Sequence, residues 1–143
     1  MLVLEDRVRF VETDMMGVVH HANYFRWFEM GRVAYLREAE INLPDLMADG
    51  YLFPITDARC TYRASAHFDE IILIKTDLVE VSRVKMVFAY QIRRKQDNLL
   101  LAEGVTQNVF TNRDNNQVSR LPNHYFERLR DYAVRNRQEG VLS

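Results

Sequence analysis

Residues 12–36 read ETDMMGVVHHANYFRWFEMGRVAYL and join a polar loop to a long apolar segment. It opens with a loop that holds a carboxylate, Asp14, then a glycine and two histidines. From Asn23 onward apolar residues cover well over half of a helix's circumference, a pattern typical of a helix buried on most sides. Asn23 is the predicted N-cap. The loop therefore brings Asp14 to the positive end of a buried helix, where main-chain N–H groups can stabilise negative charge.

The chain on either side of this stretch predicts strands and one further helix. Period-2 alternation of apolar residues indicates strands, and polar turns separate them. Pro54 predicts an edge position or a bulge in its strand, and the three strands before the last helix form a meander. The expected elements are a first strand signalled by residues 2–4 and 7–11, four further strands at 51–63, 71–81, 84–94 and 99–111, a helical turn at 42–50, and a final helix from Pro122 to about Arg137. The residues alone predict an α+β fold with one central helix packed on an antiparallel sheet.

Composition limits the classes of protein that the chain can represent. Its 143 residues, 48% hydrophobic and 27% charged, fit one domain over residues 1–143. A net charge of -1 gives no general attraction to nucleic acid. Cys60 is the single cysteine, so no internal disulfide is expected, in keeping with a reducing cytoplasm. The opening MLVLEDRVRF becomes charged too early for a signal peptide or a membrane span. We therefore expect a soluble cytoplasmic protein with no nucleic-acid partner.

The motif TDxxGVVxHANYxxWFExxR, starting at Thr13, resembles the signature of the 4-hydroxybenzoyl-CoA thioesterase family and its short-chain acyl-CoA thioesterase branch, within the hotdog-fold superfamily. The resemblance extends over nearly the whole chain, through Tyr62 and Phe68-Asp69, the strand at 100–110 and Arg120-Leu121-Pro122. It implies a sheet wrapped around the central helix. It also implies a homodimer or homotetramer built from sheets joined edge to edge, and hydrolysis of an acyl-CoA.

Within the motif, Asp14 is the candidate catalytic residue. From the residues alone, a loop aspartate that caps the local backbone is the commoner role. The resemblance instead makes Asp14 the general base or the nucleophile of thioester hydrolysis. It assigns the polarising N–H to the backbone of His21, and a side-chain role for His21 stays open. Gly17 either lets the loop approach the substrate or adopt a positive φ, or is an ordinary turn glycine. Adjacent histidines without HxxxH or CxxC spacing predict neither a metal site nor a cofactor.

Three residues are candidates for contact with the acyl group. The resemblance places Glu29 in the acyl pocket of the opposing subunit, where the hydroxybenzoyl enzymes carry aspartate, although its spacing also allows an ion pair with Arg26 or Arg32. Phe10 offers an apolar wall where the short-chain branch often has tyrosine. Trp27 is expected to pack in the core or to line the substrate. The departure at Glu29 counts against hydroxybenzoyl specificity and favours the short-chain branch. A carboxylate near apolar walls also favours a short-chain or small aromatic acyl group over a long alkyl chain.

For the coenzyme A phosphates the candidates are Arg120 and the Arg93-Arg94 pair, because guanidinium groups match phosphate geometry; simple surface solvation is the alternative for each. A non-catalytic acyl-CoA binding or regulatory domain is the second functional hypothesis, and a hydratase is a third whose motif is not found. The sequence contains no GxSxG and no glycine-rich phosphate loop. It leaves open the acyl group, coenzyme A versus an acyl carrier protein, dimer versus tetramer, and nucleophile versus base.

Overall fold

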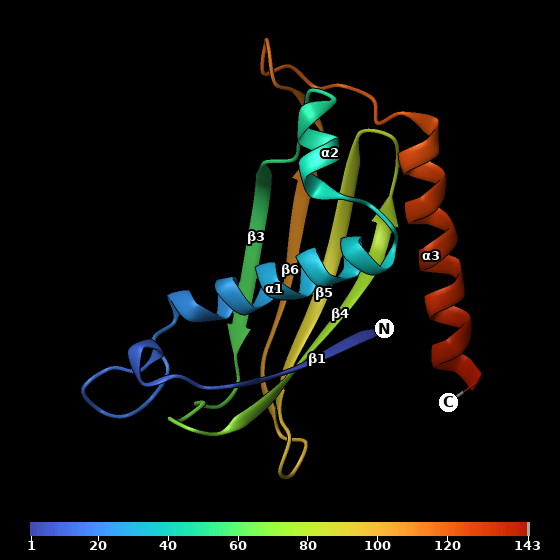
Figure 1. Cartoon of the computed structure of the whole chain (residues 1–143). Coiled ribbons are helices and arrows are strands. Elements are labelled where there is room, and N and C mark those ends of the chain that lie inside the picture. The colour runs from blue at the N-terminus through green and yellow to red at the C-terminus, as the bar shows by residue number, and fades with distance from the viewer. Residues whose placement is uncertain (143) are drawn as a thin grey trace.

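A long helix lies across one face of an antiparallel sheet in the computed structural model, which describes the backbone of residues 1–142 and the side chains of residues 1–137 (Figure 1). In chain order the elements are β1 (Leu2–Arg7), η1 (Phe10–Glu12), α1 (Ala22–Glu38), α2 (Leu43–Ala48), β2 (Tyr51–Leu52), β3 (Ile55–Tyr62), β4 (Ile71–Val81), β5 (Lys85–Arg94), β6 (Leu100–Val109), β7 (Thr111–Asn112) and α3 (Asn123–Leu142). The main sheet has five strands in the order β1-β4-β5-β6-β3, and β2 pairs with β7. The predicted α+β architecture and the β4-β5-β6 meander are confirmed.

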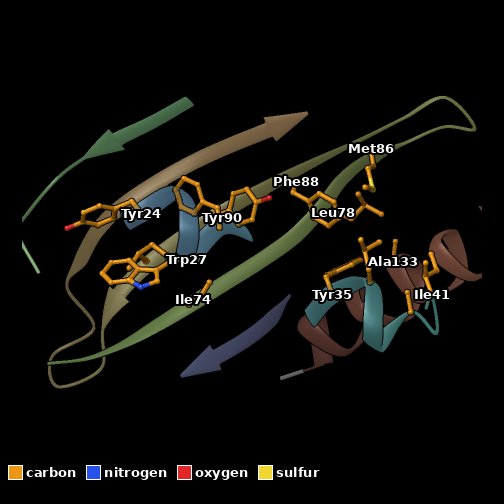
Figure 2. Close-up of a cluster of buried hydrophobic side chains, with 14 of the residues drawn as sticks. Tyr24, Trp27, Tyr35, Ile41, Ile74, Leu78, Met86, Phe88, Tyr90 and Ala133 are labelled. Carbon is orange, nitrogen blue, oxygen red and sulfur yellow. The ribbon is translucent and has the colours of Figure 1, made fainter. Parts of the chain in front are cut away.

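The core lies between α1 and the sheet face that it covers. Alternation in β4 places Ile72, Ile74 and Leu78 on that face, and all three are fully buried. Figure 2 shows the buried aromatic side chains of α1 against those of β5, with the cluster continuing to Ala133 of α3. Because this cluster joins α1 to three strands and to α3, it fixes the position of the helix on the sheet.

Two glycines allow α1 to approach the sheet closely. A Cβ atom at Gly31 would overlap Thr76 Oγ1 and lie 3.2 Å from Ile74 Cγ2. A Cβ atom at Gly104 would lie 2.6 Å from Cζ of Phe28, a side chain of α1 whose ring stacks on that of Tyr90 in β5. Both distances are shorter than van der Waals contact. The close approach of the helix to the sheet therefore requires that residues 31 and 104 have no side chain.

The two edges of the main sheet differ. Beyond Thr76, where β1 stops pairing with β4, α3 covers the rest of the β4 edge (Figure 1), and Arg137 Nη2 donates to the carbonyl oxygen of Leu78 at 2.7 Å. At the opposite edge, β3 is exposed along almost its whole length and pairs only with β6 among the described residues. An unpaired edge of this kind is free to pair with another strand.

The prediction that the first strand extends through residues 7–11 is wrong, because β1 ends at Arg7 and residues 10–12 form the 3₁₀ helix η1. The cause is local hydrogen bonding: Glu12 Oε1 accepts the Arg9 N–H at 2.7 Å, and the Thr13 N–H and hydroxyl both donate to the Phe10 carbonyl. These bonds close a turn where an extended strand was expected. Phe10 is consequently 76% exposed.

The strand predicted at residues 51–63 is divided into β2 and β3, with Pro54 between them. The proline lacks an N–H group, so it cannot continue a ladder of main-chain hydrogen bonds. The expectation of a bulge or edge at Pro54 is therefore confirmed, and the chain passes at this point from the small sheet to the edge of the main sheet.

Candidate active site

The loop that carries Asp14 is a tight hairpin formed by main-chain hydrogen bonds. Thr13 and Val19 form an antiparallel bridge, and the Asp14 N–H donates to the Val18 carbonyl at 2.8 Å. Gly17 has a φ of 80° and donates its N–H to the Asp14 carbonyl at 3.1 Å. The expected positive φ at Gly17 is confirmed, and it lets the loop turn back so quickly that Asp14 lies beside the start of α1.

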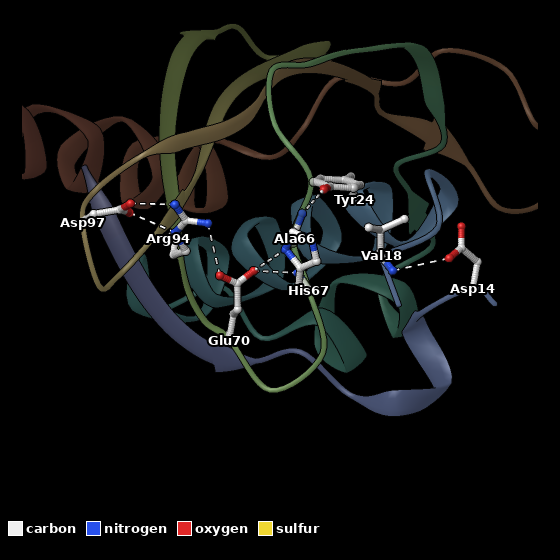
Figure 3. Close-up of polar contacts among 8 residues, drawn as sticks. All are labelled: Asp14, Val18, Tyr24, Ala66, His67, Glu70, Arg94 and Asp97. Atoms are coloured by element: carbon white, nitrogen blue, oxygen red, sulfur yellow. Dashed lines mark hydrogen bonds and ion pairs between the residues drawn. The ribbon is translucent and has the colours of Figure 1, made fainter. Parts of the chain in front are cut away.

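The two oxygens of the Asp14 carboxylate have different environments. Oδ1 accepts main-chain N–H groups from Met16 at 2.8 Å and from Val18 at 3.3 Å (Figure 3 shows the second bond). Oδ2 makes no hydrogen bond within the described part of the chain, and the side chain is exposed. One oxygen thus holds the carboxylate in a fixed orientation, and the other remains available to a substrate or a water molecule.

Helix α1 begins differently from the prediction, and Asn23 is not its N-cap. The helix starts at Ala22 with His21 at the cap position. His20 Nδ1 accepts the Ala22 N–H at 3.2 Å, so an imidazole takes the capping role expected of the asparagine. Asn23 instead uses its side chain as a donor, with Nδ2 bonding the Glu12 carbonyl at 2.8 Å. The N–H of His21 has no acceptor among the described residues, as is usual for the first N–H groups of a helix.

Asp14 and His21 line one cavity of about 270 Å³, together with Tyr24 and Tyr62. The Tyr62 hydroxyl donates to the His21 carbonyl at 3.1 Å, and the Tyr62 and His21 rings pack with centroids 4.7 Å apart. Burial raises the pKa of Tyr62 to about 12, so its hydroxyl stays protonated near neutral pH. These contacts fix the His21 ring against Tyr62, and no hydrogen bond joins the imidazole to Asp14 in the described chain.

The sequence analysis missed Glu12, a buried carboxylate that ties the loop to the helix. Only 3% of its surface is exposed. Glu12 Oε2 accepts the indole N–H of Trp27 at 3.1 Å, and its main-chain carbonyl accepts from the His20 N–H at 2.9 Å as well as from Asn23. A buried carboxylate needs such partners. The sequence offered little to indicate this role of Glu12: it is an acidic residue two positions before Asp14, and a tryptophan follows on the predicted helix.

The acyl-group candidates occupy a different place from Asp14. Trp27 is fully buried, as core packing predicts, and it also lines the cavity that holds Glu29, so contact of Trp27 with substrate stays a prediction. Glu29 is exposed and lines a second cavity of about 460 Å³ with Met30. It forms no ion pair with Arg26 or Arg32 in the described chain; Arg32 is buried and donates to the Tyr90 hydroxyl at 3.2 Å. The helix-surface ion pair that the spacing of Glu29 allowed is therefore not formed, and contact of Glu29 with substrate stays a prediction.

The phosphate candidates lie at opposite ends of the sheet. Arg120 is exposed and lies near the start of β5, because the N–H of the next residue, Leu121, donates to the Arg83 carbonyl oxygen just before that strand. Arg94 is the last residue of the same strand. A ten-residue strand spans roughly 30 Å. Arg93 donates to the Asn98 carbonyl at 2.9 Å, a bond within the β5–β6 hairpin. Arg120 and the Arg93-Arg94 pair therefore do not meet at one phosphate group within a single subunit.

Within the described residues, no group of three or more His, Cys, Asp or Glu side chains is arranged to hold a metal ion. A search of the same part of the chain also finds no helix that could span a membrane.

A long helix lying across an antiparallel sheet is the arrangement of the hotdog-fold class, and Asp14 and His21 line one cavity at the start of that helix. The chain belongs to the thioesterase-like superfamily, whose sequence profile matches residues 8–129. This confirms the family resemblance of the motif that begins at Thr13.

Three relatives illustrate the similarity. Over 88 residues the chain is 35% identical to "Putative acyl-CoA thioesterase YneP" of Bacillus subtilis, an alignment that covers 62% of this chain and 64% of YneP. The crystal structure of hypothetical protein TT1821 from Thermus thermophilus superposes with a TM-score of 0.84 and 34% identity, over 91% of this chain and 98% of that one. DHNA-CoA thioesterase from Staphylococcus aureus has a TM-score of 0.84 and 29% identity, over 95% and 90% of the two chains.

Proposed function

We propose that this protein is an acyl-CoA thioesterase that hydrolyses a short-chain or small aromatic acyl-CoA to the free acid and coenzyme A. One observation carries the proposal: Asp14 and His21 line the same cavity, and within the described chain neither Asp14 Oδ2 nor the His21 N–H has a hydrogen-bond partner. Thioester hydrolysis needs both a base or nucleophile and a donor for the carbonyl oxygen. The names of YneP and of the staphylococcal enzyme support the same reaction class.

In the proposed reaction the thioester carbonyl oxygen accepts the His21 N–H. Asp14 Oδ2 then either takes a proton from a water molecule that attacks the carbonyl carbon, or attacks that carbon itself to form a mixed anhydride. The negative charge that develops on the carbonyl oxygen lies at the positive end of α1, where main-chain donors stabilise it without reorganisation. On the base route the C–S bond breaks as the tetrahedral intermediate collapses, and the proton that Asp14 took from water passes to the coenzyme A sulfur. On the nucleophile route the coenzyme A thiolate leaves first and takes a proton from solvent, and water then hydrolyses the anhydride to the free acid and the Asp14 carboxylate.

We further propose that the active form is a homodimer or a homotetramer of such dimers. The open edge of β3 can pair with the same strand of a second subunit. Glu29 lines a cavity separate from that of Asp14 within one chain. This separation agrees with the idea that Glu29 and the apolar Phe10 complete the acyl pocket of a neighbouring subunit. Arg120, or Arg93 at the other end of the sheet, would then bind the coenzyme A phosphates.

The test is release of free thiol from acetyl-, butyryl-, benzoyl-, 4-hydroxybenzoyl- and palmitoyl-CoA. Asp14→Asn keeps the size of the side chain and removes its charge, so we expect kcat to fall by at least about a hundredfold. Asp114→Asn is the matched control, because Asp114 is an exposed loop aspartate away from the cavity. Near-normal turnover by the Asp14→Asn protein would refute the assignment of Asp14. Tight acyl-CoA binding without turnover by the wild type would favour the non-catalytic acyl-CoA binding domain instead.

A further inference from the structure

The Asp14 loop is supported by the connection between β3 and β4. Val18 and His67 form an antiparallel bridge, and the Val19 N–H donates to the Ala66 carbonyl at 2.9 Å. On its other side Val18 accepts the N–H of Asp14 and donates its own N–H to Asp14 Oδ1. The Asp14 loop thus has the Ala66-His67 segment as its outer neighbour, and a displacement of that segment changes the position of the carboxylate.

Glu70 holds the Ala66-His67 segment in place. Its Oε1 accepts the main-chain N–H of His67 at 2.6 Å and lies 3.2 Å from His67 Nδ1. The Glu70 N–H donates back to the His67 carbonyl at 3.2 Å. The turn therefore has its ends tied together by a side chain, and Figure 3 shows that His67 lies between Glu70 and the loop residue Val18.

The second oxygen of Glu70 is held from the β5–β6 hairpin. Arg94 Nη1 donates to Glu70 Oε2 at 3.3 Å, and Arg94 also donates to both oxygens of Asp97, at 3.0 and 2.6 Å. Asp97 Oδ1 accepts the Leu99 N–H at 3.1 Å, which fixes it to the hairpin backbone. The Arg94 guanidinium is thus oriented by one carboxylate and orients another, a charge-assisted arrangement with defined geometry.

Figure 3 shows these contacts as one series from Asp97 through Arg94 and Glu70 to His67, with Asp14 and Val18 beyond. The alternative use of Arg94, as a ligand of a coenzyme A phosphate, would require it to release both carboxylates. Its side chain is 22% exposed, and that of Glu70 is 20% exposed. Such partial burial favours the pair over solvent-separated ions.

We infer that Glu70, oriented by Arg94, is a positioning residue for the carboxylate of Asp14. This inference rests on the proposed thioesterase function for its kinetic consequence, but its structural part stands without it. Glu70 fixes the His67 backbone, His67 pairs with Val18, and Val18 orients Asp14. Arg94 accordingly belongs to the support of the Asp14 loop. Arg93 donates to Gln91 and to the Asn98 carbonyl and is the member of the arginine pair that has no ion-pair partner among the described residues.

The kinetic test compares Glu70→Ala with Glu70→Gln. Alanine removes the acceptor of the His67 N–H, so we expect kcat to fall by about ten- to a hundredfold with KM changed by no more than about twofold, since a small displacement of a catalytic group costs rate rather than binding. Glutamine keeps an oxygen for that N–H and should restore most of kcat. Glu80→Ala is the matched control, because Glu80 is also an ion-paired glutamate of the sheet, joined to Lys85 at 3.1 Å far from the loop. Arg94→Gln leaves the Glu70–His67 bonds in place and should give an intermediate loss of kcat, which tests the series even if Glu70→Ala does not fold.

Amide hydrogen exchange of the Val19 and His67 N–H groups gives a readout that does not depend on turnover. In Glu70→Ala both groups should exchange faster, while amides of β5 keep their wild-type rates. Unchanged kcat in Glu70→Ala, a loss confined to KM, or unchanged exchange at Val19 would each overturn the inference. If the wild type hydrolyses no acyl-CoA, the proposed function fails, and the exchange measurement alone decides whether Glu70 positions the loop.

Discussion

Replacement of Gly31 by alanine tests the close contact between α1 and the sheet. The added Cβ would overlap Thr76 Oγ1 and stand 3.3 Å from Thr76 Cβ. Crowding of this kind in a packed core costs about 1–3 kcal/mol, and the severe overlap at Gly31 indicates the upper end of that range. Alanine also gains about 1 kcal/mol in helix propensity over glycine. We therefore expect a net loss of about 2 kcal/mol, and a Tm lower by roughly 4–8 °C for a chain of this size.

The measurement is thermal and urea denaturation at a fixed protein concentration, because association contributes to the stability of an oligomer. Thr76→Ala provides the background that isolates the contact. Thr76 Oγ1 is buried and has no hydrogen-bond partner in the described chain, so its removal forfeits no hydrogen bond. In that background Gly31→Ala should cost at least about 1 kcal/mol less than in the wild type, a coupling typical of residues in direct contact.

Thr76→Val is the matched control, since it places a methyl group where the hydroxyl was and retains the overlap. Gly31→Ala should remain costly in that background. If the substitution costs the same with alanine and with valine at position 76, or if it raises Tm in the wild type, the separation of α1 from β4 is not set by Gly31 and the reasoning fails.

Two further predictions concern the polar groups that support the Asp14 loop. Trp27→Phe removes the indole N–H that donates to the buried Glu12 carboxylate, so the free energy of unfolding should fall by about 1–3 kcal/mol. Trp27 is the single tryptophan of the chain, so the variant has no tryptophan fluorescence and urea unfolding is followed by circular dichroism. An unchanged stability would contradict the role of Glu12. Hydrogen bonding from Arg94 lowers the pKa of Asp97 from 3.8 to about 2, so this pair contributes stability that is complete above about pH 4 and is lost as the pH falls to about 2. Asp97→Asn should therefore flatten the fall of Tm between pH 4 and pH 2, and an equally steep fall in this variant would refute the assignment.

The regular part of the fold could be predicted because its burial repeats with the period of each element. In β4 every second residue faces the core, and α1 buries residues at helical spacing. The prediction that α1 is buried on most sides is wrong for the single chain, because Phe25, Glu29 and Met30 on its outer face are exposed. The other errors arose where side chains bond the backbone nearby. Glu12 ended the first strand early, and His20 capped the helix in place of Asn23. Such bonds depend on loop geometry, which periodicity does not contain.

The site was predicted in part for the same reason. The positions of Asp14, Gly17 and His21 follow from a local motif, and the structure brings Asp14 and His21 to one cavity. The support of the loop by Glu70 and Arg94 joins segments 24 residues apart in the chain. Nothing in the sequence near either residue indicates this contact. The arginines grouped as phosphate ligands by composition proved to lie at opposite ends of β5.

The main-chain bonding of the Asp14 loop has a consequence for how such a protein can change. Met15 and Met16 flank the carboxylate at 104% and 85% exposure, and only the backbone of Met16 takes part in fixing it. Substitutions at these two positions can therefore accumulate by drift, or be introduced as a combinatorial library, without disturbing the orientation of Asp14. The exposed side chains that follow Asp14 in the loop are free to diversify while the carboxylate keeps its orientation.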